Sequence, residues 1–167
     1  MAKEYDISKI SFLIIDDNRY MRRIVNSALK GFGVSKLFEA SDAAEGFELF
    51  RTQMIDIIIV DYKMPTLDGV EFVQLVRTAR DSPNPYVPII MLSAYTNRAT
   101  VEHARDAGIT EFLSKPISAK SLFLYIVATL EHPRNFIRSP GYFGPDRRRK
   151  DDTAYKGPER RKSAPSL

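Results

Sequence analysis

Short apolar segments rich in β-branched residues alternate along the chain with longer segments of helical periodicity. Five segments have the length and composition of strands: residues 12–15, 36–38, 55–60, 88–92 and 112–113. Between the strands, apolar residues recur every three or four positions, as they do from Met21 to Leu29. The third strand segment is almost continuously apolar, which is typical of a central parallel strand with both faces covered.

Glycine and serine mark several ends of the helical segments. Gly31 and Gly33 follow the first one, Gly108 follows the fourth, and Ser118 is placed to cap the fifth. Five strand–helix units predict an α/β (βα)₅ fold. Because crossovers between parallel strands are right-handed, the sheet should be five-stranded, parallel and doubly wound, of the flavodoxin-like type. Ligands bind at the carboxyl ends of the strands in such sheets.

The fifth helical segment is apolar on more than one side. We expect one face of residues 122–130 to pack on the sheet, and an outer face carrying Phe123 to meet a second subunit, a partner or the rest of the chain. The run is far shorter than the ~20 apolar residues that span a bilayer. The N-terminal residues lack the apolar part of a secretory signal, so we expect a cytoplasmic protein with no membrane segment.

Composition divides the chain after Pro133. Residues 134–167 hold ten Lys or Arg against four Asp or Glu, whereas residues 1–133 hold fifteen against seventeen. The second part is rich in proline and glycine and shows no apolar periodicity. We therefore predict one domain at 1–133 and an irregular basic tail at 134–167, either disordered or folded on a partner.

The tail contains a repeat of the form Tyr-x-Gly-Pro-acid-Arg-Arg, hereafter the tail motif. Its aromatic and basic members are Tyr142, Arg147 and Arg148 in copy 1, and Tyr155, Arg160 and Arg161 in copy 2. An aromatic anchor beside two bidentate donors favours a protein target. Nucleic acid is a less favoured alternative, because acidic residues interrupt the basic ones. The arginines could also serve only to keep the tail soluble.

Polar residues capable of chemistry stand where the predicted strands end. They are Asp16 and Asp17 after the first strand, Asp61 after the third, Ser93 after the fourth and Lys115 after the fifth. Carboxylates that converge repel one another unless a cation neutralises them, and oxygen ligands favour Mg²⁺. The chain has no cysteine, which excludes disulfides and thiolate metal sites, and we assign no role to His103.

A cation, an ammonium group and a hydroxyl around a carboxylate suggest phosphoryl transfer. Asp61 would be the nucleophile and form an aspartyl phosphate. Asp17 would bind Mg²⁺ directly and Asp16 through water. Lys115 and Ser93 would each bond a phosphoryl oxygen. Taken singly, these residues could be helix caps or ordinary surface groups, but their joint placement at strand ends favours the phosphoryl-transfer interpretation.

The motifs around these residues resemble those of the receiver domains of two-component response regulators. The similarity covers residues 10–131 and includes Ile14–Asp17, Val60–Gly69, Met91–Ala94 and Ser114–Pro116. It implies a signalling switch, not an enzyme with another substrate, that takes its phosphoryl group from a histidine kinase or phosphotransfer protein. It also implies that the Lys63 carbonyl binds Mg²⁺ and that the Lys115–Pro116 peptide bond is cis. The output surface in this family spans the fourth helix, fifth strand and fifth helix.

Three residues at family switch positions differ in size or polarity from many members. Tyr95 and Lys63 occupy positions that modulate water access to the aspartyl phosphate, and both are bulky. Phe112 stands at the aromatic switch position of the family. Its ring could become buried when the Ser93 hydroxyl binds the phosphoryl group, but it has no hydroxyl with which to donate a hydrogen bond. It could equally be ordinary core. We expect slow loss of the phosphoryl group.

The sequence argues against two other classes of function. A nucleotide-binding enzyme would have a glycine-rich turn after the first strand, where Asp17 to Tyr20 offer none. A haloacid-dehalogenase-like phosphatase would have a second aspartate two residues after Asp61, where Lys63 stands. A scaffold that binds independently of phosphorylation, and a homodimer, remain open alternatives. With no effector domain after the receiver, output would pass through protein contacts or the tail.

Overall fold

The structure is a computed structural model that describes residues 5–148, and it contains the predicted five strands alternating with five helices. In chain order the elements are β1 (Ser11–Ile15), α1 (Arg19–Gly31), β2 (Lys36–Ala40), α2 (Ala43–Thr52), β3 (Ile57–Asp61), α3 (Gly69–Thr78), β4 (Ile89–Ser93), α4 (Arg98–Ala107), β5 (Glu111–Ser114), α5 (Ala119–Glu131), β6 (Phe136–Ser139) and β7 (Tyr142–Pro145). The limits of the first five strands differ from the prediction by at most two residues.

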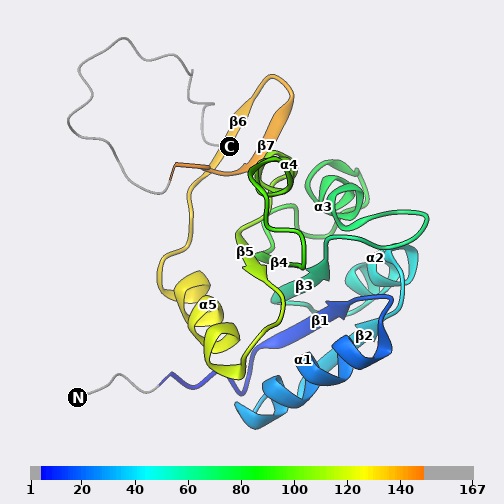
Figure 1. The fold of residues 1–167 in the computed structure, drawn as a ribbon. Coiled ribbons are helices and arrows are strands. Elements are labelled where there is room, and N and C mark those ends of the chain that lie inside the picture. Colours follow the sequence, from blue (N-terminus) through cyan, green and yellow to red (C-terminus); the bar gives the residue numbers. More distant parts are fainter. Residues whose placement is uncertain (1–4, 149–167) are drawn as a thin grey trace, which may run out of the picture.

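The five-stranded sheet has the order β2-β1-β3-β4-β5, and all its pairings are parallel. The chain runs from β1 to the edge strand β2. It then crosses to β3 on the other side of β1 and continues through β4 to the opposite edge strand, β5. Helices lie on both sides of the sheet (Figure 1), so the predicted doubly wound fold is confirmed. The direction of winding reverses between β1 and β3, and their carboxyl ends are where such folds bind ligands.

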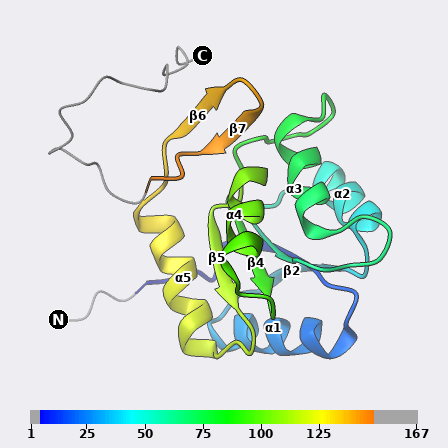
Figure 2. The ribbon, with the colours of Figure 1, turned by 45° about the horizontal axis from the view of Figure 1, so that its top comes forward.

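Alternate residues of the central strands enter two separate cores. Leu13, Ile58 and Met91 pack with residues of α2, α3 and α4, while Phe12, Ile57 and Ile90 pack with residues of α1 and α5. Figure 2 shows α1 and α5 on one side of the sheet and α2 to α4 on the other. Burial on both faces explains why the third strand reads as a continuous apolar run.

The predicted helix ends are also confirmed. Gly31 is the last residue of α1, and Gly33 has a φ of 88°. Gly108 caps α4 in the left-handed conformation, with a φ of 110°. The side chain of Ser118 caps α5 by accepting a hydrogen bond from the Ser121 amide. A left-handed residue after a helix is tolerated best by glycine, since it has no Cβ.

The outer face of α5 differs from the prediction. Leu122 and Ile126 are buried against the sheet as expected. Phe123, however, packs against Phe32 just after α1, with ring centroids 5.0 Å apart, so it is not on the outer face. The exposed large apolar residues of α5 are Leu124, at 56%, and Leu130, at 39%. Within residues 5–148, no helix has both the length and the hydropathy to cross a membrane.

The first part of the tail forms regular secondary structure, so the predicted irregular tail at 134–167 is wrong for these residues. Strands β6 and β7 form an antiparallel hairpin (the C-terminal hairpin), which turns at Gly141 with a φ of 78°. It lies beside the ends of α3 and α4 (Figures 1 and 2). The rings of Phe136 and Phe143 pack there on each other and on Tyr86, with centroids 5.0–5.6 Å apart. Copy 2 of the tail motif lies outside the described residues.

Candidate functional site

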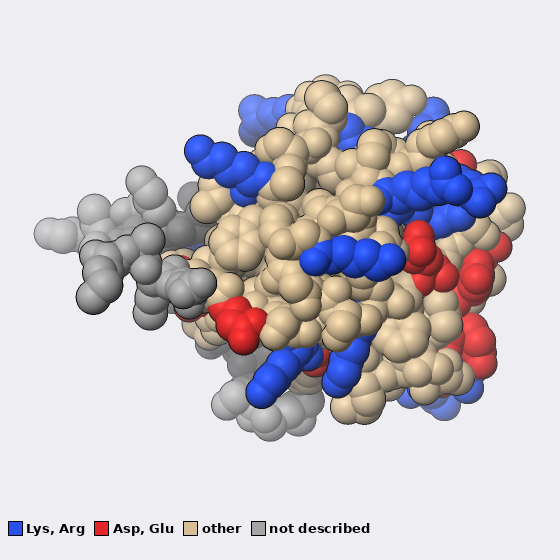
Figure 3. Space-filling model, turned by 90° about the horizontal axis from the view of Figure 1, so that it is seen from below, with Lys and Arg blue, Asp and Glu red and all other residues tan. Residues whose placement is uncertain are grey.

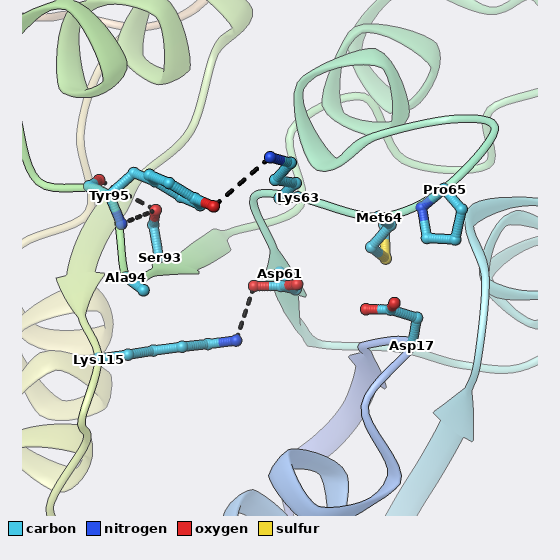
Figure 4. A pocket seen from close by; sticks show the side chains of 9 residues that line it. All are labelled: Asp17, Asp61, Lys63, Met64, Pro65, Ser93, Ala94, Tyr95 and Lys115. Atoms are coloured by element: carbon cyan, nitrogen blue, oxygen red, sulfur yellow. Dashed lines mark hydrogen bonds and ion pairs between the residues drawn. The ribbon is translucent and has the colours of Figure 1, made fainter.

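The five residues predicted at strand ends come together at one edge of the sheet. Asp16 and Asp17 follow β1, Asp61 and Ser93 are the last residues of β3 and β4, and Lys115 follows β5. Asp17, Asp61, Ser93 and Lys115 line a cleft of about 490 Å³, toward which their side chains point in Figure 4. The reversal of winding between β1 and β3 places the acidic residues side by side.

Three carboxylates converge in this cleft. One oxygen from each of Asp16, Asp17 and Asp61 lies within 4.8 Å of the other two. Asp16 and Asp61 are almost fully buried, whereas Asp17 is exposed. Asp16 is held by a hydrogen bond from the Asn18 amide to its Oδ1, of 2.8 Å. This set of hard oxygen donors, open on one side, fits a magnesium ion that keeps part of its water shell.

Lys115 is the cation that the structure places against this cluster. Its Nζ lies 2.8 Å from Asp61 Oδ1 and 3.2 Å from Asp16 Oδ2. Burial acts to lower the pKa of Lys115, but the hydrogen bond to Asp61 and the two nearby carboxylates outweigh it and raise the pKa. Lys115 is therefore protonated at neutral pH. The peptide bond between Lys115 and Pro116 is cis, as the family resemblance implies.

The surroundings of Asp61 raise the pKa of its carboxyl group. Burial raises its pKa to about 6, the hydrogen bond from Lys115 opposes this, and the charges of Asp16 and Asp17 add to it. A single lysine therefore does not offset the repulsion among three carboxylates and the loss of their hydration. A divalent cation would.

Ser93 and Tyr95 form a compact turn beside Asp61. The Ser93 hydroxyl donates to the Tyr95 carbonyl oxygen at 3.0 Å and accepts from the Tyr95 amide at 2.9 Å. The Tyr95 side chain reaches back over the cleft, where its hydroxyl lies 3.4 Å from Lys63 Nζ (Figure 4). The Lys63 ammonium also lies 5.1 Å from the centre of the Tyr95 ring. The two residues predicted to control water access thus contact each other.

Two features of the site are not apparent from the sequence. Gly69 begins α3 directly behind the site, where a Cβ would collide with the carbonyl oxygen of Asp61. Tyr62 links the site to α4, because its hydroxyl lies 3.3 Å from Nδ1 of His103. Both features depend on contacts between segments far apart in sequence. Phe112, in β5, is half-buried against the core that α2 to α4 cover.

The tail motif is separate from this site. Tyr142 and Arg147 of copy 1 lie at the ends of α3 and α4, with Arg147 paired to Asp106 of α4 and Arg148 paired to Asp146 of the motif itself. Asp106 and Gly108 precede β5, at the opposite edge of the sheet from the carboxyl ends. Tyr155, Arg160 and Arg161 lie outside the described residues.

Residues 12–127 match the response regulator receiver domain family. The chain is 33% identical over 115 residues to a probable chemotaxis protein CheY of Rhizobium etli, which is 68% of this chain and 87% of that protein. It is 28% identical over 113 residues to the chemotaxis protein CheY-3 of Vibrio cholerae, covering 68% and 85% respectively. The chain belongs to the response regulator receiver domain family.

Solved structures agree with the fold. The chemotaxis protein CheY4 of Vibrio cholerae aligns with a TM-score of 0.65 and 28% identity, over 71% of this chain and 96% of that one. A probable two-component response regulator with a GGDEF domain aligns with a TM-score of 0.65 and 26% identity, over 74% of this chain and 50% of that one. The chain is thus a receiver domain of the two-component and chemotaxis class, with a C-terminal addition.

Proposed function

We propose that the chain is a phosphorelay switch in which Asp61 accepts a phosphoryl group from a histidine kinase or a phosphotransfer protein. The observation that carries the proposal is the position of the Asp61 carboxylate, which lies against the Lys115 ammonium and beside the carboxylates of Asp16 and Asp17. A carboxylate oxygen attacks the phosphorus of a phosphohistidine, so that a P–O bond forms, the P–N bond breaks and the imidazole leaves.

Asp16, Asp17 and Asp61 would hold Mg²⁺, with the backbone carbonyl of Lys63 as a further ligand by similarity to the family. When bound, the ion would neutralise charge on the transferred phosphoryl oxygens. Lys115 is already placed beside the Asp61 oxygen that it would share with the incoming group. The Ser93 hydroxyl would donate to another phosphoryl oxygen, and to do so it must give up the hydrogen bond that it donates to the Tyr95 carbonyl oxygen.

The proposed output is a change in protein contacts, with no catalysis beyond self-phosphorylation and self-dephosphorylation. The surface of α4, β5 and α5 would contact an output protein, and so would the tail. The face seen from below in Figure 3 carries basic side chains interspersed with acidic and uncharged ones, not one continuous basic patch. That mixture favours a protein partner over a polyanion on this face.

The proposal is tested by incubating the full chain with acetyl phosphate and measuring its intact mass. One phosphoryl group should be gained with Mg²⁺ and none with EDTA. Asp61→Asn should gain none, and Asp17→Asn should need far more Mg²⁺. A phosphoryl group retained by Asp61→Asn, or uptake that ignores EDTA, would contradict the assignment.

A further inference from the structure

Copy 1 of the tail motif is bound to the carboxyl end of α4 by the residues that define the motif. The Arg147 guanidinium pairs with Asp106 and lies 4.6 Å from the centre of the Tyr142 ring. The Tyr142 hydroxyl donates to the Pro145 carbonyl oxygen at 2.6 Å, which shapes the turn. Gly144 is buried against Gly108, since a Cβ on Gly144 would lie 2.9 Å from the Gly108 Cα. The motif therefore recognises an acidic residue beside a helix-ending glycine.

Docking of the C-terminal hairpin carries a free-energy cost. Within residues 5–148, the buried side-chain atoms that lack a hydrogen-bond partner are Arg77 Nη2 and Arg147 Nε. Both residues lie where the hairpin contacts the helices. Arg77 of α3 lies 5.0 Å from the centre of the Phe136 ring, and Arg147 pairs with Asp106 of α4. A buried N–H without an acceptor loses free energy relative to water, which would satisfy both atoms if the hairpin separated. Because of these two atoms, separating the hairpin costs less free energy than its aromatic contacts alone would require.

Helix α4, on which copy 1 is docked, is itself loosely held. Its buried residues are Thr100, Ala104 and Ala107, all with small side chains. Helix α3 beside it buries larger ones, including Phe72 and Val76. Because stabilisation follows the apolar area removed from water, α4 can shift against the sheet at lower cost than α3.

One helix connects the hairpin with the phosphoacceptor site. In its middle, α4 contacts the site through His103, whose Nδ1 lies 3.3 Å from the hydroxyl of Tyr62, the residue after Asp61. It follows the loop in which Tyr95 holds the Ser93 hydroxyl. At its end, Asp106 and Gly108 hold copy 1. A change in the Ser93–Tyr95 turn therefore acts on the same ten-residue helix that binds the hairpin.

We propose that copy 1 is an intramolecular ligand of α4 that phosphorylation of Asp61 releases, which exposes it for an acidic protein surface. This rests on the proposed function of Asp61. When the Ser93 hydroxyl donates to a phosphoryl oxygen, it releases the Tyr95 carbonyl oxygen. The loop that leads into α4 then rearranges, α4 shifts, and the contacts of Asp106 and Gly108 with the hairpin are lost. Released copy 1 then presents Tyr142 and Arg147 to a partner that supplies an acidic residue, as Asp106 does in the docked state.

Hydrogen exchange of the full chain, followed by mass spectrometry of peptides covering 136–148, tests the release. With acetyl phosphate and Mg²⁺, exchange in these peptides should rise roughly tenfold while that of β1 and β3 stays constant. Asp61→Asn under the same conditions sets the baseline. Unchanged exchange in a chain whose intact mass shows full phosphorylation overturns the release alone. A chain that takes up no phosphoryl group overturns the proposed function and the release together.

Charge reversal tests the docking contact without phosphorylation. Arg147→Glu and Asp106→Arg should each raise exchange in 136–148, and the double variant should restore protection, because the pair is re-formed with opposite signs. Arg148→Glu is the matched control, since Arg148 pairs with Asp146 inside the tail and should leave exchange near the wild-type value. Single reversals that leave protection intact, or a double variant as exposed as the singles, overturn the docking contact.

Discussion

At the residue scale, the site is defined by an imbalance of charge around Asp61. Three carboxylates meet with one lysine between two of them, and burial raises the pKa of Asp61 to about 6. All five site residues could be predicted from sequence, because each stands at a strand end and the fold brings those ends together. The hydrogen bonds between Ser93 and Tyr95 could not, since they depend on a loop conformation that no periodicity indicates.

The charge imbalance predicts the stability of Asp61→Asn. In the folded chain the pKa of Asp61 is raised from 3.8 to about 6, so the folded state binds more protons than the unfolded state between these values. Stability therefore falls as pH rises through this window. Without divalent cations, the variant should be more stable than wild type at pH ~7.5 by roughly 1–2 kcal/mol, after allowance for solvent screening.

Urea unfolding in EDTA checks this prediction. The difference between the two proteins should shrink as the pH falls through the window from about 6 to 3.8, and it should vanish below this window, where Asp61 is protonated in both states. Added Mg²⁺ should stabilise wild type more than the variant, because only wild type has all three carboxylates. A variant that is less stable than wild type at neutral pH would show that the Lys115 pair outweighs the repulsion.

Tyr95 should set the lifetime of the phosphoryl group. Its ring and its contact with Lys63 cover the cleft from the side of β4. Tyr95→Ala should hydrolyse its phosphoryl group several-fold faster, because water reaches Asp61 more easily, whereas Tyr95→Phe keeps the ring and should change less. The decay of phosphorylated protein after removal of acetyl phosphate measures both. Equal lifetimes in all three proteins would mean that other residues control water access.

At the element scale, contacts between segments distant in sequence account for what sequence reasoning missed. Helix ends at Gly108 and Ser118 were predictable from local capping rules. Phe123 was misplaced because its position follows from the packing of α5 on Phe32. The C-terminal hairpin was missed because Tyr86, which precedes β4, completes its aromatic cluster.

Gly69 provides a test of how tightly α3 is packed behind the site. Gly69→Ala should destabilise the fold by about 1–3 kcal/mol, because the new methyl group meets the Asp61 carbonyl oxygen and forces β3 and α3 apart. Gly31→Ala is the matched control, since nothing lies within 4 Å of a Cβ there. It should be neutral or stabilising. Similar unfolding midpoints for the two variants in urea would refute the tight contact.

At the scale of the whole molecule, the proposed phosphoacceptor site and the C-terminal hairpin lie at opposite edges of one sheet, and α4 runs between them. The position of the site at the carboxyl edge of the sheet could be predicted from the alternation of strands and helices, and the family matched to residues 12–127 agrees with it. The C-terminal hairpin could not be predicted, because residues 134–148 have too few apolar positions to show the periodicity of a strand.

An exposed apolar pair on α1 should take part in docking the phosphodonor. Tyr20 and Ile24 are one turn apart and are 73% and 49% exposed, just after the acidic residues. Ile24→Asp should slow transfer from a phosphorylated kinase at least several-fold and leave acetyl phosphate uptake unchanged, because only the protein donor needs this surface. Met54→Asp is the control, since Met54 is exposed before β3, at the opposite edge. Equal transfer rates for both variants would exclude the pair.

Reduction of the phosphorylated chain with borohydride tests the central claim most directly, because it converts an aspartyl phosphate to homoserine and so marks the acceptor. After incubation with acetyl phosphate and Mg²⁺, peptide sequencing by mass spectrometry should find homoserine at position 61, with unmodified aspartate at 16 and 17. Homoserine at another position, or none in a chain that has gained a phosphoryl group, would contradict the account.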